Sequence, residues 1–198
     1  GKHNNYSIIT DNGQNLFDPG KKPSENIRFL TFICAFIEAV DKYALLLRLS
    51  ASSAGNDHRL GANEAPPAII SIYLGSFIED TLYSLYQDHP SQKKTDTPSE
   101  FNPLSNLSYI PHDNTDRNRT SPVAFTGNKF EFRMVGSNSS ISDANTVLNT
   151  AVSEVLGQFA DELERCENFN EKINSIIKRV IKDHKRIIFN GNGYDESW

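Results

Sequence analysis

Residues 128–136, NKFEFRMVG, carry a strict alternation of charged and apolar side chains. Three charged residues (Lys129, Glu131 and Arg133) alternate with three large apolar ones (Phe130, Phe132 and Met134). Because successive side chains of a strand point to opposite faces, this period of two predicts a strand with one charged and one apolar face. The apolar face requires a core. The charged face is either a solvated surface or a carboxylate between two cations that holds a metal ion or an anionic ligand, since burying it is otherwise costly.

The composition describes a mildly acidic chain of 198 residues with a net charge of −5 and a pI near 5.5. This length can bury a real core, as one domain or as a domain with an appendage. No basic excess is present to neutralise phosphates, which argues against a nucleic-acid or membrane-surface role. The apolar runs are too short for a membrane span and no signal peptide opens the chain, so we expect a cytoplasmic protein.

Two further features of the composition bear on context. Cys34 and Cys166 lie in helical patterns without zinc-type spacing, which predicts two reduced thiols. The chain opens on Gly1 instead of Met, as a piece of a longer protein would.

The first half of the chain alternates between regular elements and breakers. Residues 3–10 are strand-like, and the Asp-Asn-Gly at 11–13 is a two-residue hairpin signal before residues 14–17 return. After the breakers at 20–23, Ser24 is expected to cap a helix over 25–49 with an apolar stripe. Residues 50–67 are rich in small residues, Gly and Pro, which predicts a long loop that works on a ligand.

Besides the NKFEFRMVG strand, the chain after residue 67 is predicted to contain one buried strand, three helices and one polar insertion. The apolar run 68–74 predicts the strand, and residues 76–86 predict a short amphipathic helix. Residues 88–106 are polar and contain prolines, which predicts a surface insertion without chemistry. Apolar stripes predict two further helices over about 144–164 and 170–186.

Three separate stretches of the chain contain motifs of polar and charged residues. They are GKHNNYSIITDNGQNLFDPG (1–20), RLGANEAPP (59–67), and the series NRTSPVAF, NKFEFRMVG and DANTVLNT (118–150). The first resembles the Gly-x-His-x-His-x-Ser strand and hairpin of glutamine synthetases. The second resembles their arginine, loop and Glu-Ala-Pro segment, and the third their Asn-Arg-Ser, Ile-Glu-x-Arg and Ala-Asn-Pro-Tyr-Leu series. The strings GNDHRLGANEAPP and NKFEFRMVG are most similar to the type III branch of that family.

The resemblance implies a metal and nucleotide site. His3 falls on the family's metal-binding histidine, and Glu131 falls on the glutamate that ligates the same ATP-bound ion, Mg²⁺ or Mn²⁺. Carboxylates with one imidazole suit such a hard cation. The residues that fall on the nucleotide side are Asn5, Ser7, Arg119 and Lys129. Asn5 stands where many relatives carry a second histidine, so contact with the base must differ there.

The resemblance also implies the substrate-binding and catalytic residues. Arg59 falls on the arginine that takes the α-carboxylate of glutamate, a natural partner for a guanidinium fork. Arg119 falls on the arginine that stabilises the transferring γ-phosphate, and Arg133 on the arginine beside the phosphoryl-transfer centre. Glu64 falls on the glutamate of the loop that closes over the substrate and takes a proton from ammonium. The Arg59–Glu64 interval is one residue shorter than usual, and Ala124 replaces a second arginine.

The activity implied by the resemblance is ATP-dependent ligation of ammonia to L-glutamate, giving glutamine through γ-glutamyl phosphate. Phosphoryl transfer depends on positioning and electrostatic stabilisation, which metal ions and the arginines would supply. The second step needs a closed site and a base, which suits a loop that carries Glu64. Two alternatives stay open: a γ-glutamyl ligase for another amine, and a non-catalytic paralogue that acts only in assembly.

The implied fold is α+β, with antiparallel strands in a sheet around the site, backed by helices and truncated on its N-terminal side. Residues 1–155 would form part of the catalytic domain, with an insertion at about 75–113, and residues 156–198 a helical extension specific to type III. Family members place further metal carboxylates and a β-domain before this point, and neighbouring subunits of a homo-oligomeric ring complete each site. We therefore expect this chain to fold but to make no glutamine alone.

Overall fold

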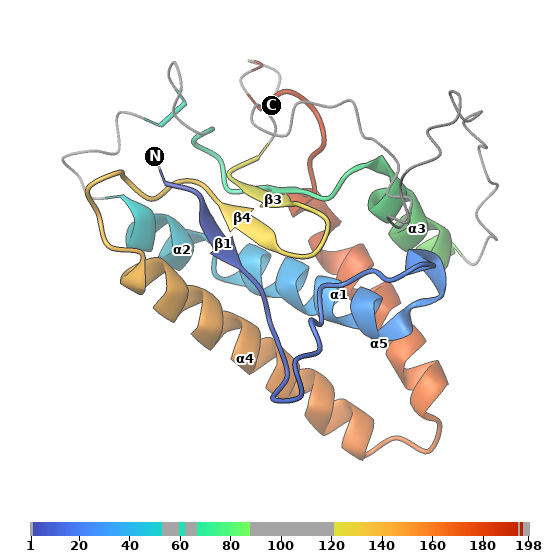
Figure 1. Ribbon diagram of the computed structural model, residues 1–198. Coiled ribbons are helices and arrows are strands. Elements are labelled where there is room, and N and C mark those ends of the chain that lie inside the picture. Colours follow the sequence, from blue (N-terminus) through green and yellow to red (C-terminus); the bar gives the residue numbers. More distant parts are fainter. Residues whose placement is uncertain (1, 53–59, 62–66, 88–120, 194, 196–198) are drawn as a thin grey trace, which may run out of the picture.

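The computed structural model describes residues 2–52, 60–61, 67–87, 121–193 and 195. Within them, four short strands form one sheet in the order β1-β4-β3-β2 (Figure 1). The strands are β1 (Asn4–Tyr6), β2 (Ile72–Tyr73), β3 (Val123–Phe125) and β4 (Phe130–Phe132). The longer helices are α1 (Ile27–Lys42), α4 (Ser142–Glu164) and α5 (Phe169–His184). The predicted α+β class is confirmed.

The sheet is mixed, whereas the prediction was antiparallel throughout. β4 pairs antiparallel with both β1 and β3, but β2 and β3 run parallel. The short turn between β3 and β4 allows an antiparallel pair. β2 and β3 are separated by helix α3 (Ser76–Gln87) and by residues 88–120, and parallel neighbours need a long crossover of this kind.

The register confirms the alternation predicted for the NKFEFRMVG stretch. Glu131 lies opposite Asn5 on β1 and Ala124 on β3. Phe130 lies opposite Tyr6 and Phe125. Because directly opposite residues share a face, one face of the sheet is apolar and the other carries Glu131.

The apolar face of the sheet packs on α1 through a cluster of aromatic rings. Phe36 of α1 stacks on Phe130 with centroids 3.8 Å apart and an interplanar angle of 12°. Phe17 meets both rings edge-on, at 5.8 and 5.1 Å. Edge-on contacts such as those of Phe17 are a favoured arrangement of aromatic pairs, and the whole cluster joins the sheet to the helix.

The N-terminal hairpin is confirmed, but its loop has three residues instead of two. The Leu16 N–H donates to the Ile8 carbonyl (2.9 Å) and the Thr10 N–H to the Gln14 carbonyl (3.0 Å), which leaves residues 11–13 as the loop. Gly13 has φ +83°, the left-handed position that three-residue hairpin loops commonly assign to glycine.

The helix predicted over residues 25–49 is in fact two helices. Helix α1 ends at Lys42, Tyr43 breaks the run, and α2 (Ala44–Ala51) follows. The N-cap is Asn26, whose side chain accepts a hydrogen bond from the Phe29 N–H (3.1 Å). Ser24 is not the cap because it lies in a 3-10 turn, Pro23–Glu25. Asn and Ser cap equally well, so the sequence alone did not separate them.

The other helical predictions are confirmed within two residues by α3, α4 and α5. The strand predicted over 68–74 contracts to β2, and β3 was not predicted. The insertion predicted at 88–106 lies outside the described residues. Both cysteines are free, as expected. Among the described residues, none of the helices combines the length and apolar character that a membrane span requires.

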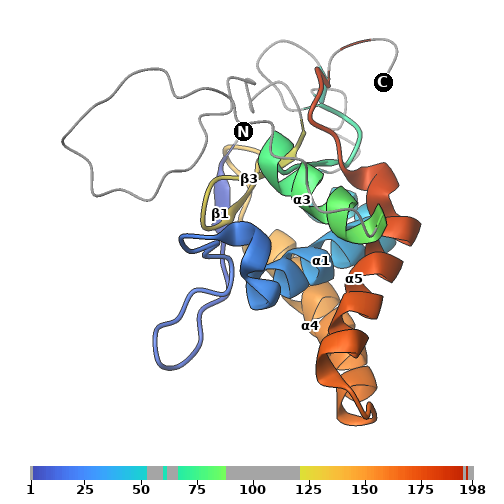
Figure 2. The ribbon, with the colours of Figure 1, turned by 90° about the vertical axis from the view of Figure 1, so that its right-hand side faces the viewer.

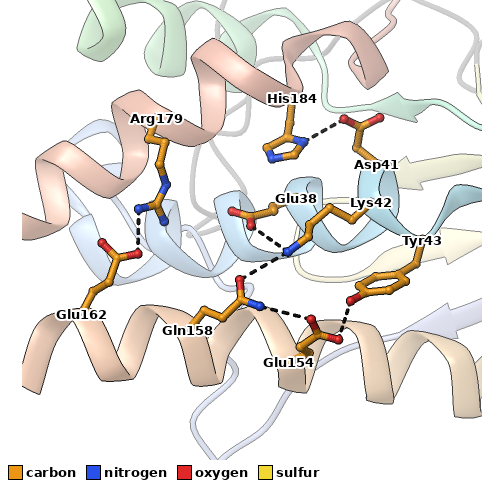
Figure 3. Close-up of polar contacts among 9 residues, drawn as sticks. All are labelled: Glu38, Asp41, Lys42, Tyr43, Glu154, Gln158, Glu162, Arg179 and His184. Atoms are coloured by element: carbon orange, nitrogen blue, oxygen red, sulfur yellow. Dashed lines mark hydrogen bonds and ion pairs between the residues drawn. The ribbon is translucent and has the colours of Figure 1, made fainter.

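Polar side chains join α1 to the two long helices that cover it (Figure 3). Lys42 lies 3.6 Å from Glu38 and donates to Gln158 of α4 (3.3 Å). Tyr43, at the break after α1, donates to Glu154 of α4. On α5, His184 Nδ1 lies 2.7 Å from the Asp41 carboxylate. These contacts tie α1 to both helices beneath the sheet.

Candidate active site

The face of the sheet that carries Glu131 points away from the helices. In Figure 1, helices α1, α4 and α5 lie below the sheet, and Figure 2 again shows α1 and α4 below it, with α5 running down from about the height of the strands. Asn5 lies directly opposite Glu131 on the neighbouring strand, and His3 is two residues before it along the chain. Side chains at spacing two share a face, so the strand pairing puts His3, Asn5 and Glu131 on the same face of the sheet.

His3 and Glu131 are brought close together by this arrangement. His3 Nδ1 lies 3.7 Å from Glu131 Oε2, with side-chain exposures of 55% and 10%. The Lys2 N–H donates to the Val135 carbonyl (2.8 Å), which continues the pairing of the two segments beyond β1. The His3 imidazole is therefore accessible to solvent, whereas the Glu131 carboxylate beside it is almost buried.

The separation of these two donor atoms is compatible with a shared divalent cation. Ligand bonds to Mg²⁺ or Mn²⁺ are about 2.1 Å long, so donor atoms up to about 4.2 Å apart can touch one ion. The observed 3.7 Å lies inside that limit. Within the described part of the chain, no group of three or more His, Cys, Asp or Glu side chains gathers as a metal site. The pair is thus part of a ligand set at most.

Arg133 is buried beside this pair and is held by backbone. Its guanidinium donates to the Ser121 carbonyl, and its backbone N–H donates to the Pro122 carbonyl (2.9 Å). The predicted cationic neighbour Lys129 lies in the β3–β4 turn and is half-buried, with its carbonyl accepting from the Thr126 N–H (2.9 Å). The two cations therefore lie on either side of Glu131 along the chain. Lys129 precedes β4 in the turn, and Arg133 follows directly after β4.

The remaining predicted nucleotide residues on β1 are placed differently. Asn5 is exposed on the Glu131 face. Ser7 is half-buried, and its hydroxyl lies 3.5 Å from the side-chain oxygen of Asn15, across the hairpin. Asn5 is accessible to a ligand, whereas Ser7 is also engaged in holding the hairpin.

Three predicted site residues, Arg59, Glu64 and Arg119, lie outside the described residues. Their roles in substrate binding and catalysis stay predictions. Ala124, which we expect to stand where relatives carry a second arginine, is fully buried and pairs with Glu131 across β3 and β4.

One pair of residues near the site was missed from the sequence. Asn4 is buried, and its Nδ2 donates to Oδ1 of Asn145 on α4 (2.8 Å). The sequence did contain one signal for Asn4. It stands two residues before Tyr6, so in a strand its polar side chain falls on the face that should be apolar.

Comparison with known proteins finds relatives along the whole chain. Residues 172–198 match the family described as glutamine synthetase C-terminal domain. The full chain is 47% identical over 201 residues to a type-3 glutamine synthetase of Dictyostelium discoideum, of which it covers 27%. It is 46% identical over 210 residues to a glutamine synthetase of Butyrivibrio fibrisolvens, and 45% over 206 residues to one of Bacteroides fragilis (strain YCH46), covering 28% of each.

Along its whole length the chain is thus similar to part of three proteins named glutamine synthetase, and its last residues match the family described as glutamine synthetase C-terminal domain. The predicted resemblance is thereby confirmed, and the type-3 relative agrees with the predicted branch. The chain spans little more than a quarter of the length of these curated relatives.

Proposed function

We propose that the longer protein to which this chain corresponds ligates ammonia to L-glutamate at the expense of ATP, giving glutamine through γ-glutamyl phosphate. The observation that carries the proposal is the 3.7 Å approach of His3 and Glu131 on a sheet face turned away from the helices. Identity of 45–47% along the whole of this chain to parts of three glutamine synthetases supports the same reaction.

His3 and Glu131 would hold a divalent cation, Mg²⁺ or Mn²⁺, which when bound neutralises charge on the nucleotide phosphates. Arg133, Lys129 and Arg119 would add positive charge along the path of the transferring phosphoryl group. Asn5 and Ser7 would contact the nucleotide. Each of these groups would position or stabilise charge, which is how phosphoryl transfer is chiefly accelerated.

Two residues of the 50–67 stretch are given roles in substrate binding and in the second step. Arg59 would bind the α-carboxylate of glutamate through its fork of N–H donors. Glu64 would take a proton from ammonium as the loop closes and water is excluded from the acyl phosphate.

The organisation of the parent protein also stays a proposal. Further metal ligands would come from outside this chain, within a homo-oligomeric ring, and the chain alone would make no glutamine. The division at residue 155 is a proposal too. Helix α4 (Ser142–Glu164) runs through that position without a break.

The test is Glu131→Gln in the full-length protein, which keeps the shape of the side chain and removes its charge. We expect weaker binding of Mn²⁺ and a loss of kcat/KM for glutamine formation of about 100-fold or more, comparable to removing one stabilising group at a transition state. The control is Glu167→Gln, an exposed glutamate beyond the end of α4, which should change neither quantity. Unchanged Mn²⁺ binding in Glu131→Gln would refute the site.

The two alternatives are separated by other measurements on the same protein. A γ-glutamyl ligase for another amine would prefer that amine over ammonia when both are offered with glutamate and ATP. An assembly paralogue would bind no ATP. Formation of γ-glutamyl hydroxamate by this chain alone, dependent on ATP and Mg²⁺, would contradict its expected inactivity.

A further inference from the structure

Asn4 is a polar side chain on the apolar side of β1. It lies opposite Phe132 in the sheet and two residues before Tyr6, which packs against Phe36. Its residue exposure is 3%. A buried amide is destabilising unless its polar atoms find partners, so its placement here needs a reason beyond packing.

Its partner is Asn145, in the first turn of α4. Asn4 Nδ2 donates to Asn145 Oδ1 over 2.8 Å, between residues 141 positions apart. The bond therefore joins edge strand β1, which carries Asn5 of the candidate site, to helix α4.

A second contact lies on the other side of His3. Lys2 Nζ donates to the Ser139 carbonyl (2.6 Å), in the segment that leads from β4 to α4. His3 thus stands between two residues, Lys2 and Asn4, that are both bonded to residues 139–145. Its own side chain is more than half exposed, so it gains little from packing of its own.

We propose that the Asn4–Asn145 hydrogen bond is a positioning contact that keeps His3 within ligand distance of Glu131, and so sets the affinity of this pair for a divalent cation. The His3 side chain is more than half exposed, and the pair works only if its donor atoms stay close enough for one ion. Contacts behind metal ligands commonly hold them in this way. The inference rests on the metal role given to His3 and Glu131 under the proposed function.

The experiment measures binding of Mn²⁺ alone to the full-length protein, from the loss of the free-ion paramagnetic resonance signal. Asn145→Ala should weaken binding about 10-fold or more, the usual effect of removing a contact behind a ligand. Asn145→Asp keeps an acceptor opposite the Asn4 amide and should retain the affinity. Asn149→Ala, the same change at an exposed position one turn later in α4, is the matched control and should also retain it.

A structural readout accompanies the titration. In a crystal structure of Asn145→Ala, His3 Nδ1 and Glu131 Oε2 should lie more than about 4.2 Å apart, too far for one ion with ligand bonds of about 2.1 Å. If Asn145→Ala does not fold, the double variant Asn4→Leu, Asn145→Leu removes both amides together and leaves no unpaired group. It should show the same loss of affinity.

The outcomes separate this inference from the proposed function. Unchanged Mn²⁺ affinity in the folded Asn145 variant, while Glu131→Gln loses binding, overturns the positioning role alone. If Glu131→Gln also binds normally, the metal site itself is refuted. A loss in Asn149→Ala equal to that in Asn145→Ala would equally overturn the inference, because the effect would not depend on the Asn4 contact.

Discussion

Glu131 and Arg133 are buried to 7% and 4% exposure although each carries a formal charge. Charged side chains are rarely buried unless they are paired. Here Arg133 donates to the Ser121 carbonyl and Glu131 lies beside His3. The charged row of the strand is therefore not a solvated surface, which removes the simpler of the two readings of the alternation.

Tyr6 gives a test at the same scale. Burial raises the pKa of its hydroxyl from 10.0 to about 12. Between these values the unfolded chain loses a proton that the folded chain keeps, so stability should fall as pH rises, by up to about 1.4 kcal/mol per pH unit. Tyr6→Phe should remove this part of the alkaline loss, as measured by urea unfolding at pH 9 to 11.

The comparison is made between slopes, because other groups also titrate in this range. Tyr194→Phe supplies the same chemical change near the end of the chain and serves as the reference for the method. Equal slopes in Tyr6→Phe and the unmodified chain would show that Tyr6 ionises in the folded state as easily as in the unfolded state.

At the scale of elements, α4 and α5 are held together by Glu162. Its carboxylate lies 2.9 Å from Lys172 Nζ and 2.6 Å from Arg179 (Figure 3 shows the second contact). Burial by itself would raise the pKa of Glu162, but hydrogen bonds and charge from these two cations outweigh it, so the pKa lies below its ordinary value. One acid thus serves two basic residues of the facing helix.

Glu162→Gln should destabilise the chain at pH 7, by less than about 1 kcal/mol because the ion pairs are partly exposed. The lowered pKa means that the contribution is present above the ordinary carboxyl value of 4.5 and is lost as pH falls through the folded-state value. The difference from the parent chain should therefore shrink toward pH 3 in unfolding titrations. Glu164→Gln, an exposed acid of the same helix, should show no such difference. A gap that persists at pH 3 would contradict the electrostatic origin.

At the scale of the molecule, the C-terminal segment after α5 packs along strand β2 at the edge of the sheet. The Phe189 N–H donates to the Ile72 carbonyl (2.8 Å), and Ile188 forms a parallel bridge with Ile72. The Asn190 side chain accepts from the N–H groups of Leu74 and Gly75 (3.0 and 3.1 Å) and donates to Glu79 of α3. Residues more than a hundred positions apart are joined at this one side chain.

Asn190→Ala should therefore be costly. It leaves the N–H groups of Leu74 and Gly75 without their acceptor in a buried position, which we expect to lower the free energy of unfolding by about 2 kcal/mol. Amide hydrogen exchange at these two residues should accelerate. Asn192→Ala, the same change two residues later at an exposed position, should have a much smaller effect. Similar exchange rates in both variants would show that Asn190 does not hold this junction.

The sequence was informative where patterns are long. Helices α3, α4 and α5 each span three or more turns, so their apolar stripes repeat and define them. β3 (Val123–Phe125) is apolar throughout and shows no alternation that would mark it as a strand, and the strand predicted over 68–74 contracts to the two residues of β2. The break at Tyr43 was also missed, because the apolar spacing continues across it.

For the candidate site too, local sequence patterns predicted one part and missed another. Alternation placed Glu131 on a charged face, but no local pattern connects it to His3, 128 residues earlier. The resemblance to glutamine synthetases made that connection, and the β1–β4 register provides its physical basis. Asn145 was invisible from the sequence because its role depends on a contact with Asn4 that only the packing of α4 creates.

The burial of Cys34 in α1 has a practical consequence. Burial, with the negative charge of Glu38 as a smaller cause, raises the pKa of this thiol, so almost no reactive thiolate forms near neutral pH. Cys166, between α4 and α5, is only half-buried. Thiol reagents should therefore attach a probe to the helical hairpin alone while the fold is intact, and reaction at Cys34 would mark the moment when the core around α1 opens.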